Sequence, residues 1–576
     1  MQKIIRRREL TQLTQFDHPL HPLLQRIYSA RGVQHGRELQ YQLAHLLKPN
    51  FKGLADAVGL LADAVVAQAK VVIVGDFDAD GATSSALAVL ALRAMGLTTV
   101  DFLVPNRFEY GYGLTPEIVA VAAAQQPDII ITVDNGISSI EGVNAARELG
   151  IAVIVTDHHL PGAVLPDADA IVNPNQPGCE FPSKNLAGVG VIFYVMNALR
   201  GELRQIGWFE ENGIPEPNMA SFLDLVALGT VADVVPLDHN NRILVAQGLE
   251  RIRAGRCRPG IKAMLEVAGK QAHKLVASDF GFALGPRLNA AGRLDDMSLG
   301  IQCLLCESEN LAREMATQMD ELNRDRKAIE SGMQQEAMGM LQKTLQADAN
   351  DLPWGVCLFD ETWHQGVIGI LASRIKDKYH RPTIVFAEVS DTEIKGSARS
   401  VPGLHIRDAL DAIAARYPGL LQKFGGHAMA AGMSLERKNF TAFAKAFDDE
   451  VRRQLNEVDL QAVVISDGEL LASDFSLQLA AQLRDAGPWG QHFPEPIFDG
   501  EFFLLQQRKV GDKHLKMTLA LDAHGQQSVD AIAFNVDINS WPNPQIQKVR
   551  MAYRLDINEF RGNINLQLLV DYLEPL

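Results

Sequence analysis

Cysteine and long apolar runs are both scarce in this chain. Its 576 residues include five cysteines, an odd and sparse set that argues against a disulfide framework and for a reducing compartment. Cys303 and Cys306 form a CxxC pair inside the apolar run IQCLLCES, and with no second pair nearby we interpret them as buried helix thiols. The most apolar stretch, residues 55–74, contains charged side chains and does not predict a membrane span. The basic N-terminus has no apolar run behind it, so we expect no secretory signal and a cytoplasmic protein.

Positive charge is also in short supply. Lys and Arg total 54 against 70 Asp and Glu, for a formal net charge of −16. Such a chain has no overall attraction for nucleic acid or anionic membrane, so it must bind any polyanion through a local basic groove or through metal ions. The P-loop, HExxH and full GxGxxG motifs are missing, which leaves nucleotide-hydrolase, zincin and dinucleotide-binding classes without support. A hydrophobic content of 47% is ordinary for globular proteins, and the length predicts several domains.

Short apolar runs alternate with helical segments between residues 70 and 157. The predicted strands are VVIVG at 71–75, VDFLVP at 100–105, DIIITVD at 128–134 and IAVIVTD at 151–157. Near-continuous apolar runs of this kind are typical of a parallel sheet that is covered on both faces. The pattern therefore predicts a doubly wound α/β domain.

Three further regions follow this domain. Residues 308–346 lack proline and repeat apolar side chains at helical spacing, which predicts one long amphipathic helix. A second α/β pattern comes next, and five strand-like runs after about residue 460 indicate a small antiparallel barrel or sandwich. We divide the chain into a helical appendage over 1–45, a catalytic α/β domain over 46–270, a connecting segment and long helix over 271–346, a second α/β domain over 347–458 and the barrel over 459–576.

Carboxylates and histidines lie where three of the predicted strands end. They are Asp76, Asp78 and Asp80 after the first strand, Asp134 after another, and Asp157, His158 and His159 after a third. Ligands of open α/β sheets bind outside the carboxyl ends of the strands, so we expect these side chains to meet. Asp233, in ALGTVADVV, is a further candidate.

Such a cluster of carboxylates repels itself at short range, and a bound cation is the usual resolution. Oxygen ligands with one imidazole suit Mg²⁺ or Mn²⁺ better than zinc. The number of ligands indicates two ions, an arrangement that activates water and stabilises in-line attack on phosphorus. A single aspartate after a strand is more often a turn former or a helix N-cap, and for Asp157 alone we prefer that interpretation.

The motifs around these residues resemble the DHH phosphoesterase superfamily. They are GDFDADGATSSA, VPNRFEYGYGL, TVDNGIS and VTDHH, followed in order by ALGTVADVVPL, GPRLNAAGR, WHQGVIGILASRI, KGSARS and FGGHAMAAG. The ordered set, from about residue 40 to the C-terminus, is similar to the RecJ family of bacterial single-strand-specific 5′→3′ DNA exonucleases. The resemblance implies a DHH domain, joined by the long helix to a second α/β domain of the DHHA1 type, and a C-terminal OB-fold barrel.

The resemblance also implies roles for the strand-end residues. The metal ligands are Asp78, Asp80, Asp134, His158 and Asp233, with Asp134 between the two ions. His159 resembles the catalytic histidine, which stabilises a phosphoryl oxygen or assists proton transfer, and it acts with Asp134 and Asp76. Many DHH phosphatases have a histidine where this chain has Val74. Asp76 would then support the first metal directly or, as we prefer, through water.

A 5′→3′ exonuclease must recognise a chain end, and a terminal phosphate needs arginine, hydroxyl and backbone N–H donors. The matched motifs imply that the phosphate and DNA contacts are Arg107, Arg287, Asn289, Arg293, Ser397, Arg399 and His427. For any one of these arginines alone, a surface salt bridge is the commoner role. The bases would stack on aromatic side chains such as Phe108, Tyr110 or Tyr112.

We therefore expect a metal-dependent exonuclease that degrades single-stranded DNA from the 5′ end to 5′-mononucleotides. The resemblance implies a role in DNA repair and recombination and a partnership with single-stranded-DNA-binding protein. We expect a monomer and no association with membranes. Two alternatives stay open, a phosphodiesterase of short or cyclic oligonucleotides and a non-catalytic DNA-binding scaffold.

Overall fold

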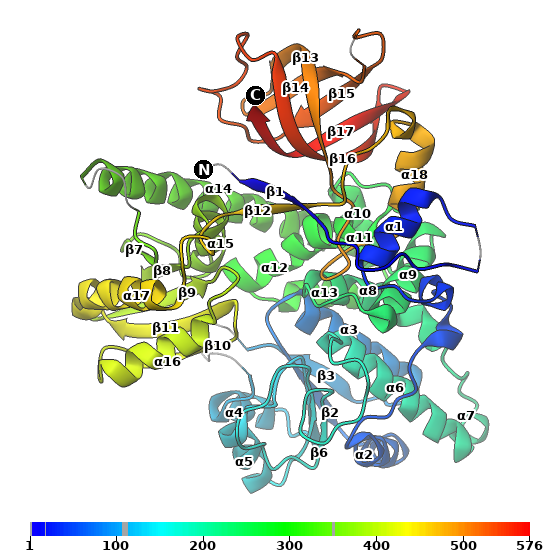
Figure 1. Ribbon diagram of the computed structural model, residues 1–576. Helices are drawn as coiled ribbons and strands as arrows, with labels where there is room; N and C mark the ends of the chain where they lie inside the picture. The colour runs from blue at the N-terminus through cyan, green and yellow to red at the C-terminus, as the bar shows by residue number, and fades with distance from the viewer. Residues whose placement is uncertain (1–2, 18, 106–112, 348–351, 523) are drawn as a thin grey trace. The chain divides into compact units, whose positions relative to one another are not determined.

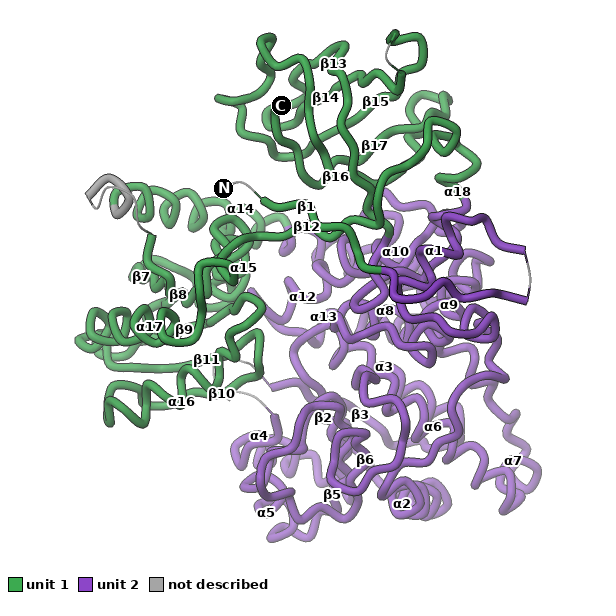
Figure 2. The backbone as a smooth tube through the Cα atoms, viewed as in Figure 1, with its two compact units in different colours: residues 1–9, 324–481, 496–576 green, residues 10–323, 482–495 purple. Residues whose placement is uncertain are grey.

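The computed structural model describes residues 3–17, 19–105, 113–347, 352–522 and 524–576. The chain divides into two compact units (Figure 2). The larger unit comprises residues 10–323 and 482–495, and the other comprises residues 1–9, 324–481 and 496–576. None of the helices in these ranges is long and apolar enough to cross a membrane.

A five-stranded parallel sheet forms the centre of the larger unit (Figure 1). Its strand order is β3 (Val100–Leu103), β2 (Val71–Gly75), β4 (Ile129–Val133), β5 (Ala152–Thr156) and β6 (Ala170–Val172). Every residue of β2 and β4 is buried, because helices cover both faces. The predicted doubly wound parallel sheet is thereby confirmed.

The helices around this sheet come from several parts of the chain. On one face, α4 (Pro116–Ala123) and α5 (Ile140–Glu148) share an apolar core with Val72, Ile130 and Val153 of the strands. Two further helices pack on the sheet: α3 (Ala79–Ala94) packs on β2, and α6 (Gly188–Gln205) packs on β4 and β5. The other helices of the unit are α1 (Pro22–Ala30), α2 (Leu54–Ala67), α7 (Trp208–Glu211), α8 (Leu223–Ala232), α9 (His239–Arg253), α10 (Pro259–Val267), α11 (Ala277–Asp279), α12 (Gly285–Leu294) and α13 (Ser298–Leu305).

The strand order reverses between β2 and β4. From β2 the chain passes through α3 to β3 on one side, whereas β4, β5 and β6 follow one another on the other side. At such a switch point the two connections diverge and leave a crevice at the carboxyl ends of the strands. The sheet topology therefore places the ends of β2 and β4 side by side at the position where α/β proteins bind ligands.

The long predicted helix is present as α14 (Glu309–Ala347) and is followed by a second sheet. That sheet has the order β10 (Lys423–Gly426), β11 (Ala430–Glu436), β9 (Glu393–Arg399), β8 (Thr383–Glu388) and β7 (Val356–Phe359). Its apolar contacts on one side include α14 and α15 (Ile368–Tyr379). A second apolar cluster of this sheet includes side chains of α16 (Ile406–Arg416) and α17 (Phe440–Gln454).

The C-terminal strands form a closed barrel, as the resemblance to an OB-fold implied. The barrel order is β13 (Phe498–Val510), β14 (His514–Ala520), β15 (Ser528–Ala533), β17 (Asn563–Pro575) and β16 (Lys548–Phe560). Neighbours are antiparallel except β15 and β17, whose parallel pairing closes the barrel. The helix α18 (Leu477–Asp485) precedes it in the chain.

The prediction that residues 1–45 are helical is wrong at the N-terminus. Ile4–Arg7 form strand β1, which pairs in parallel with β12 (Val463–Ser466). The Arg7 guanidinium also binds the carboxylate of Asp499 at 2.8 Å. The partners of β1 lie about 460 residues away in the sequence, so local periodicity could not indicate this pairing.

A buried carboxylate holds α17 to α16. The Glu450 side chain has no exposed surface and accepts hydrogen bonds from Arg453 at 2.5 Å and Arg416 at 3.0 Å. The hydrogen bond from Arg453 is the main cause that lowers the pKa of Glu450 to about 2. Because the folded pKa lies below the ordinary value, ionised Glu450 stabilises the fold above about pH 4.5, and this contribution is lost as the pH falls toward 2.

We predict that Glu450→Gln lowers the free energy of unfolding by about 2 kcal/mol at pH 7, a figure discounted because both arginines are partly exposed. The difference from the parent should shrink as the pH falls from about 4.5 to about 2. Denaturant unfolding at several pH values measures both effects, with the exposed Glu457→Gln as control. A pH-independent difference would contradict the prediction.

Candidate metal centre

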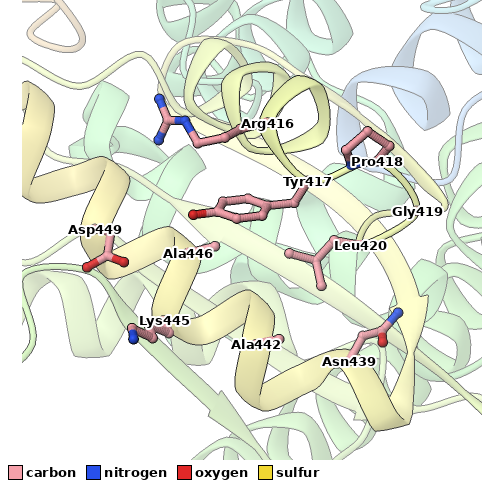
Figure 3. A pocket seen from close by; sticks show the side chains of 10 residues that line it. All are labelled: Arg416, Tyr417, Pro418, Gly419, Leu420, Asn439, Ala442, Lys445, Ala446 and Asp449. Carbon is pink, nitrogen blue, oxygen red and sulfur yellow. The ribbon is translucent and has the colours of Figure 1, made fainter.

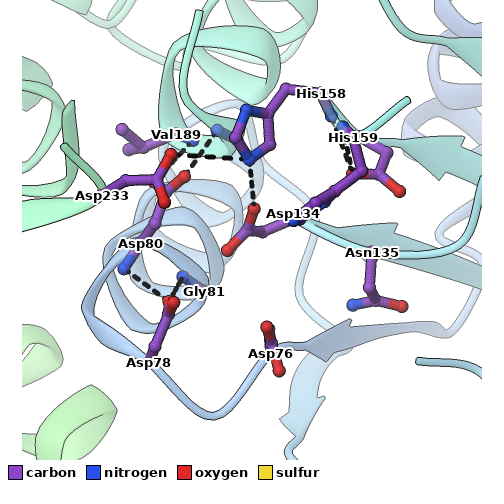
Figure 4. Close-up of polar contacts among 12 residues, drawn as sticks. Asp76, Asp78, Asp80, Gly81, Asp134, Asn135, His158, His159, Val189 and Asp233 are labelled. Carbon is purple, nitrogen blue, oxygen red and sulfur yellow. Dashed lines mark hydrogen bonds and ion pairs between the residues drawn. The ribbon is translucent and has the colours of Figure 1, made fainter. Parts of the chain in front are cut away.

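The predicted strand-end residues come together at the switch point (Figure 4). Asp76 to Asp80 follow β2, Asp134 follows β4, and His158 and His159 follow β5. The loop after α8 brings in Asp233, whose Oδ2 lies 3.5 Å from His158 Nε2. His158 Nε2 also lies 3.1 Å from Asp134 Oδ1, so this imidazole lies between two carboxylates.

Three overlapping groups of side chains have ligand atoms within 4.8 Å of one another. They are Asp76 with Asp78 and Asp134, Asp80 with His158 and Asp233, and Asp134 with His158 and His159. Asp134 and His158 each belong to two of these groups. The donors are carboxylate oxygens with imidazole nitrogens, a set that fits Mn²⁺ or Mg²⁺.

Backbone amides at the start of α6 hold one of the carboxylates. Gly188 N donates to Asp80 Oδ2 at 2.6 Å, and Val189 N donates to Asp80 Oδ1 at 3.0 Å. A helix N-terminus favours negative charge, so this end of α6 orients Asp80. A Cβ atom at Gly188 would lie 2.6 Å from Asp134 Cβ, so the helix can approach the site this closely only with glycine there.

Two aspartates of the site also shape the backbone. Asp78 is the N-cap of α3, where its Oδ1 accepts from the amides of Asp80 at 2.9 Å and Gly81 at 3.1 Å. Asp134 has a φ of +62°, a left-handed conformation that is uncommon outside glycine and concentrates at functional sites. For Asp78, the N-cap and ligand interpretations are therefore compatible.

The electrostatics of the site indicate a place for cations. Burial raises the pKa of Asp80 to about 7, and the charge of Asp78 adds to the shift. Burial, with repulsion from Asp80 and Asp78, raises the pKa of Asp134 and of Asp233 well above the ordinary aspartate value. Divalent ions among these oxygens would offset the repulsion and keep the carboxylates ionised.

His159 is held by Asp157, to which the sequence analysis assigned only a turn-forming role. His159 Nδ1 donates to Asp157 Oδ1 at 2.7 Å, and the same carboxylate accepts from the amides of His158 and Ile137. Burial opposes the charged imidazole, but the hydrogen bond to Asp157 and the negative charges of Asp157, Asp76 and Asp78 together outweigh it and raise the pKa of His159 to about 9. The sequence could have indicated this hydrogen bond, because Asp157 directly precedes the two histidines.

The residue in place of the missing histidine, Val74, is fully buried in β2. Its neighbour along the chain, Asp76, is 6% exposed and has a carboxylate oxygen in the group with Asp78 and Asp134. This placement lets Asp76 serve as a direct ligand. The preference for support through water stays a prediction.

Residues of GPRLNAAGR lie on α12, beside the start of α3. Asn289 Oδ1 accepts a hydrogen bond from Ala79 N at 2.8 Å. Arg287 Nη2 forms a buried ion pair with Asp320 Oδ1 of α14 at 2.7 Å, which favours a positioning role for this arginine. Arg293 is partly buried in the last turn of α12.

The remaining predicted contacts belong to the other unit or lie outside the described residues. Ser397 and Arg399 end β9, and His427 follows β10. Arg399 Nη1 donates to Ser397 Oγ at 3.1 Å, and burial lowers the pKa of Arg399. Arg107, with the proposed stacking residues Phe108, Tyr110 and Tyr112, lies outside the described residues.

A separate pocket lies between the end of α16 and α17 (Figure 3). Tyr417, Leu420, Lys445 and Asp449 are among the residues that line it. In the described part of the chain, no group of three metal-ligating side chains lies in this pocket. The cluster at the switch point is therefore the better candidate for chemistry.

Known protein families match three parts of this chain. Residues 70–230 match the DHH family, N-terminal domain, residues 352–453 match the DHHA1 domain, and residues 466–572 match the RecJ OB domain. Over 576 residues the chain is 56% identical to the single-stranded-DNA-specific exonuclease RecJ of Salmonella typhimurium, and the match covers 100% of both chains. It is also 56% identical to the RecJ of Escherichia coli, with 99% of each chain covered.

Solved structures of similar proteins contain divalent metals. The crystal structure of RecJ from Thermus thermophilus in complex with Mn²⁺ matches with a TM-score of 0.78 at 29% identity. The match covers 96% of this chain and 76% of that one. The same protein in complex with Mg²⁺ matches with a TM-score of 0.72 at 27% identity, over 96% of this chain and 75% of that one. These metals are the ones that the donor set at the switch point favours.

We predict opposite effects of Asp134→Asn with and without metal. In EDTA the variant should unfold a few degrees higher than the parent, because one of several mutually repelling carboxylates is gone. With saturating Mn²⁺ the parent should be stabilised by at least about 2 kcal/mol, and the variant by much less. Thermal unfolding measures both effects, with the exposed Asp63→Asn as control. Equal stabilisation of parent and Asp134→Asn by Mn²⁺ would contradict the assignment.

Proposed function

The chain belongs to the RecJ family of single-stranded-DNA-specific exonucleases, and on this basis we propose that it degrades single-stranded DNA from the 5′ end to 5′-mononucleotides. The observation that carries the proposal is the convergence of carboxylates and imidazoles from three strand ends and the α8 loop. A site of this composition suits hydrolysis of a phosphodiester, in which negative charge develops on phosphoryl oxygens.

We propose that the site holds two divalent ions, Mn²⁺ or Mg²⁺. Asp76, Asp78 and Asp134 would hold one, while Asp80, His158 and Asp233 would hold the other. The support is that the ligand atoms of each of these two sets lie within 4.8 Å of one another, and that Asp134 Oδ1 lies 3.1 Å from His158 Nε2. When bound, such ions lower the pKa of a coordinated water and offset charge on the phosphoryl group.

His159 and Asp157 act as a pair in this proposal. The hydrogen bond from His159 Nδ1 to Asp157 favours the protonated imidazole and raises its pKa. A protonated imidazole can donate a hydrogen bond to a phosphoryl oxygen as negative charge grows there. Asp157 fixes the orientation of the ring through Nδ1, so that Nε2 is the atom that reaches the substrate.

Arg399, Ser397 and the start of α15 would bind the 5′-terminal phosphate. A Cβ atom at Gly369, in the first turn of α15, would lie 2.9 Å from both Arg399 Nη2 and Ser397 Oγ. A guanidinium, a hydroxyl and a helix N-terminus thus adjoin one another. Arg399 donates to Ser397 Oγ and Ala398 O, and no carboxylate of the described residues forms an ion pair with it, so a phosphate would supply the missing negative charge.

Two further parts of the proposal rest on the family. Repair and recombination, and a partnership with single-stranded-DNA-binding protein, follow from the RecJ resemblance. The barrel would extend the DNA track through exposed Arg508, Lys509, Lys513 and Arg561. Lys516 is a weaker contributor because its Nζ is 2.8 Å from Asp530 Oδ2.

We predict that a long single-stranded DNA labelled at its 3′ end shortens progressively while it keeps its label. The activity should require Mn²⁺ or Mg²⁺, stop in EDTA, and leave duplex DNA intact. Asp134→Ala should lower the rate by at least about a thousandfold because both ions lose a ligand, whereas exposed Asp63→Ala should match the parent. Gel electrophoresis over time follows the reaction. Immediate loss of the label would show the opposite polarity, and no digestion in any metal would reject the proposal.

We predict that Arg399→Ala slows digestion of 5′-phosphorylated DNA about tenfold to a hundredfold, the usual effect of losing a charge-assisted hydrogen bond. DNA with a 5′-hydroxyl end should be affected much less. Initial rates on the two substrates give the comparison, with exposed Arg407→Ala as the matched control. An equal loss on both substrates would show that Arg399 does not recognise the terminal phosphate.

A further inference from the structure

Phe282 is exposed to solvent on a turn that packs against the segment leading to Asp233. It is 86% exposed, the highest value among the exposed large hydrophobic residues of the described chain. Phe280, two residues earlier, is fully buried. Single exposed apolar side chains are common on protein surfaces, so the exposure alone carries no function. The backbone conformation around Phe282 and the segments packed against it are the observations that indicate a function.

The backbone of Phe280–Leu284 is a π-helical turn. Gly285 N donates to Phe280 O, five residues back, in place of the usual four. Such turns are rare and occur frequently at functional sites, because the wider turn changes the direction in which side chains project. Here the turn leads directly into α12, so a distorted segment presents Phe282 from a rigid helical support.

This turn packs against the segment that supplies a metal ligand. A Cβ atom at Gly281 would lie 3.8 Å from Val231 Cγ1, and one at Gly285 would lie 3.2 Å from Ala232 Cβ. The next residue of that segment is Asp233, a member of the ligand cluster. Val234 follows, with a φ of +63° and 62% of its surface exposed. A β-branched residue in this conformation is strained, and strain of this kind concentrates at functional sites.

The helix α12, which continues from the turn, approaches the metal centre on the side of α3. The Asn289 carboxamide of α12 caps the amide of Ala79, between Asp78 and Asp80. A Cβ atom at Gly292 would clash with Phe77 O, so α12 contacts the loop after β2 directly. Residues 280–292 therefore adjoin two of the segments that carry candidate metal ligands, the loop after β2 and the loop after α8.

We propose that Phe282 is a positioning residue that stacks on a nucleobase of the strand being cleaved. This inference rests on the proposed function and adds a base contact to the phosphate contacts. An unpaired base offers an apolar face of any sequence, and an exposed aromatic ring on a rigid support is the side chain that binds it. Val234 would provide an adjoining apolar contact. The base beside the scissile phosphate would thus be held while the strand advances.

The test is a double-mutant cycle in which one change is a substitution of Phe282 and the other is the removal of a single base from the DNA. Fluorescence anisotropy would measure binding of labelled oligothymidylate with Ca²⁺ in place of Mn²⁺, so the result does not depend on cleavage. One abasic residue would be placed in turn at each of the first eight positions from the 5′ end. Phe282→Ala should weaken binding of intact DNA about tenfold, within the range for loss of one stacked base. Phe282→Trp should bind like the parent, and exposed Leu149→Ala is the control.

The decisive result is the dependence on base position. At one position, or two adjacent ones, the abasic residue should weaken binding by the parent about tenfold and have no further effect on Phe282→Ala. If an abasic residue weakened DNA binding by the parent and by Phe282→Ala equally at every position, the proposal would be overturned. Unchanged binding of intact DNA by Phe282→Ala would also overturn it. With Mn²⁺, the same variant should raise KM for digestion and change kcat little. Failure of the parent to digest DNA would reject the proposed function, whereas the binding cycle would still decide the role of Phe282.

Discussion

Mutual repulsion among buried carboxylates is the constraint around which this structure is built. Asp80 and Asp134 are buried and Asp233 is partly buried, all near further aspartates, and their pKa values are raised as a result. Left to itself, such a cluster would spread apart or take up protons. The surrounding fold prevents the first, since the ends of β2 and β4 are fixed by a sheet that is buried on both faces. Divalent ions bound among these oxygens would counter the second.

Backbone groups and backbone geometry help to hold the ligands at close range. The amides at the start of α6 orient Asp80, and glycine at position 188 allows that helix to approach Asp134. The left-handed backbone of Asp134 turns its carboxylate toward His158. Backbone dipoles stabilise the anions and leave their remaining lone pairs for metal, whereas arginine or lysine would compete with the ions.

The residues that the sequence pattern identified divide into those that meet in one cluster and those with other partners. Asp76, Asp78, Asp80 and Asp134 could be predicted because strand ends of a parallel sheet meet at one edge. Asp157 was underestimated, since its role depends on the hydrogen bond to His159, which a turn-forming aspartate need not make. Arg287 was matched to DNA by its motif, yet its charge is met by Asp320, a partner on a distant helix.

The sequence alone determined the doubly wound sheet and the 39-residue helix α14, because buried strands have near-continuous apolar runs and an amphipathic helix has a local apolar period. For the C-terminal strands it left a barrel or a sandwich open, and the family resemblance indicated the barrel. It also determined the ligand types, since chemistry selects carboxylate and imidazole. Only the tertiary structure decided which of these side chains lie within 4.8 Å of one another, which amides hold Asp80, and that Ile4–Arg7 pair as a strand with residues 463–466. These features join residues that are far apart in the chain. Secondary-structure propensity and the spacing of residues in the sequence do not predict which distant residues come into contact.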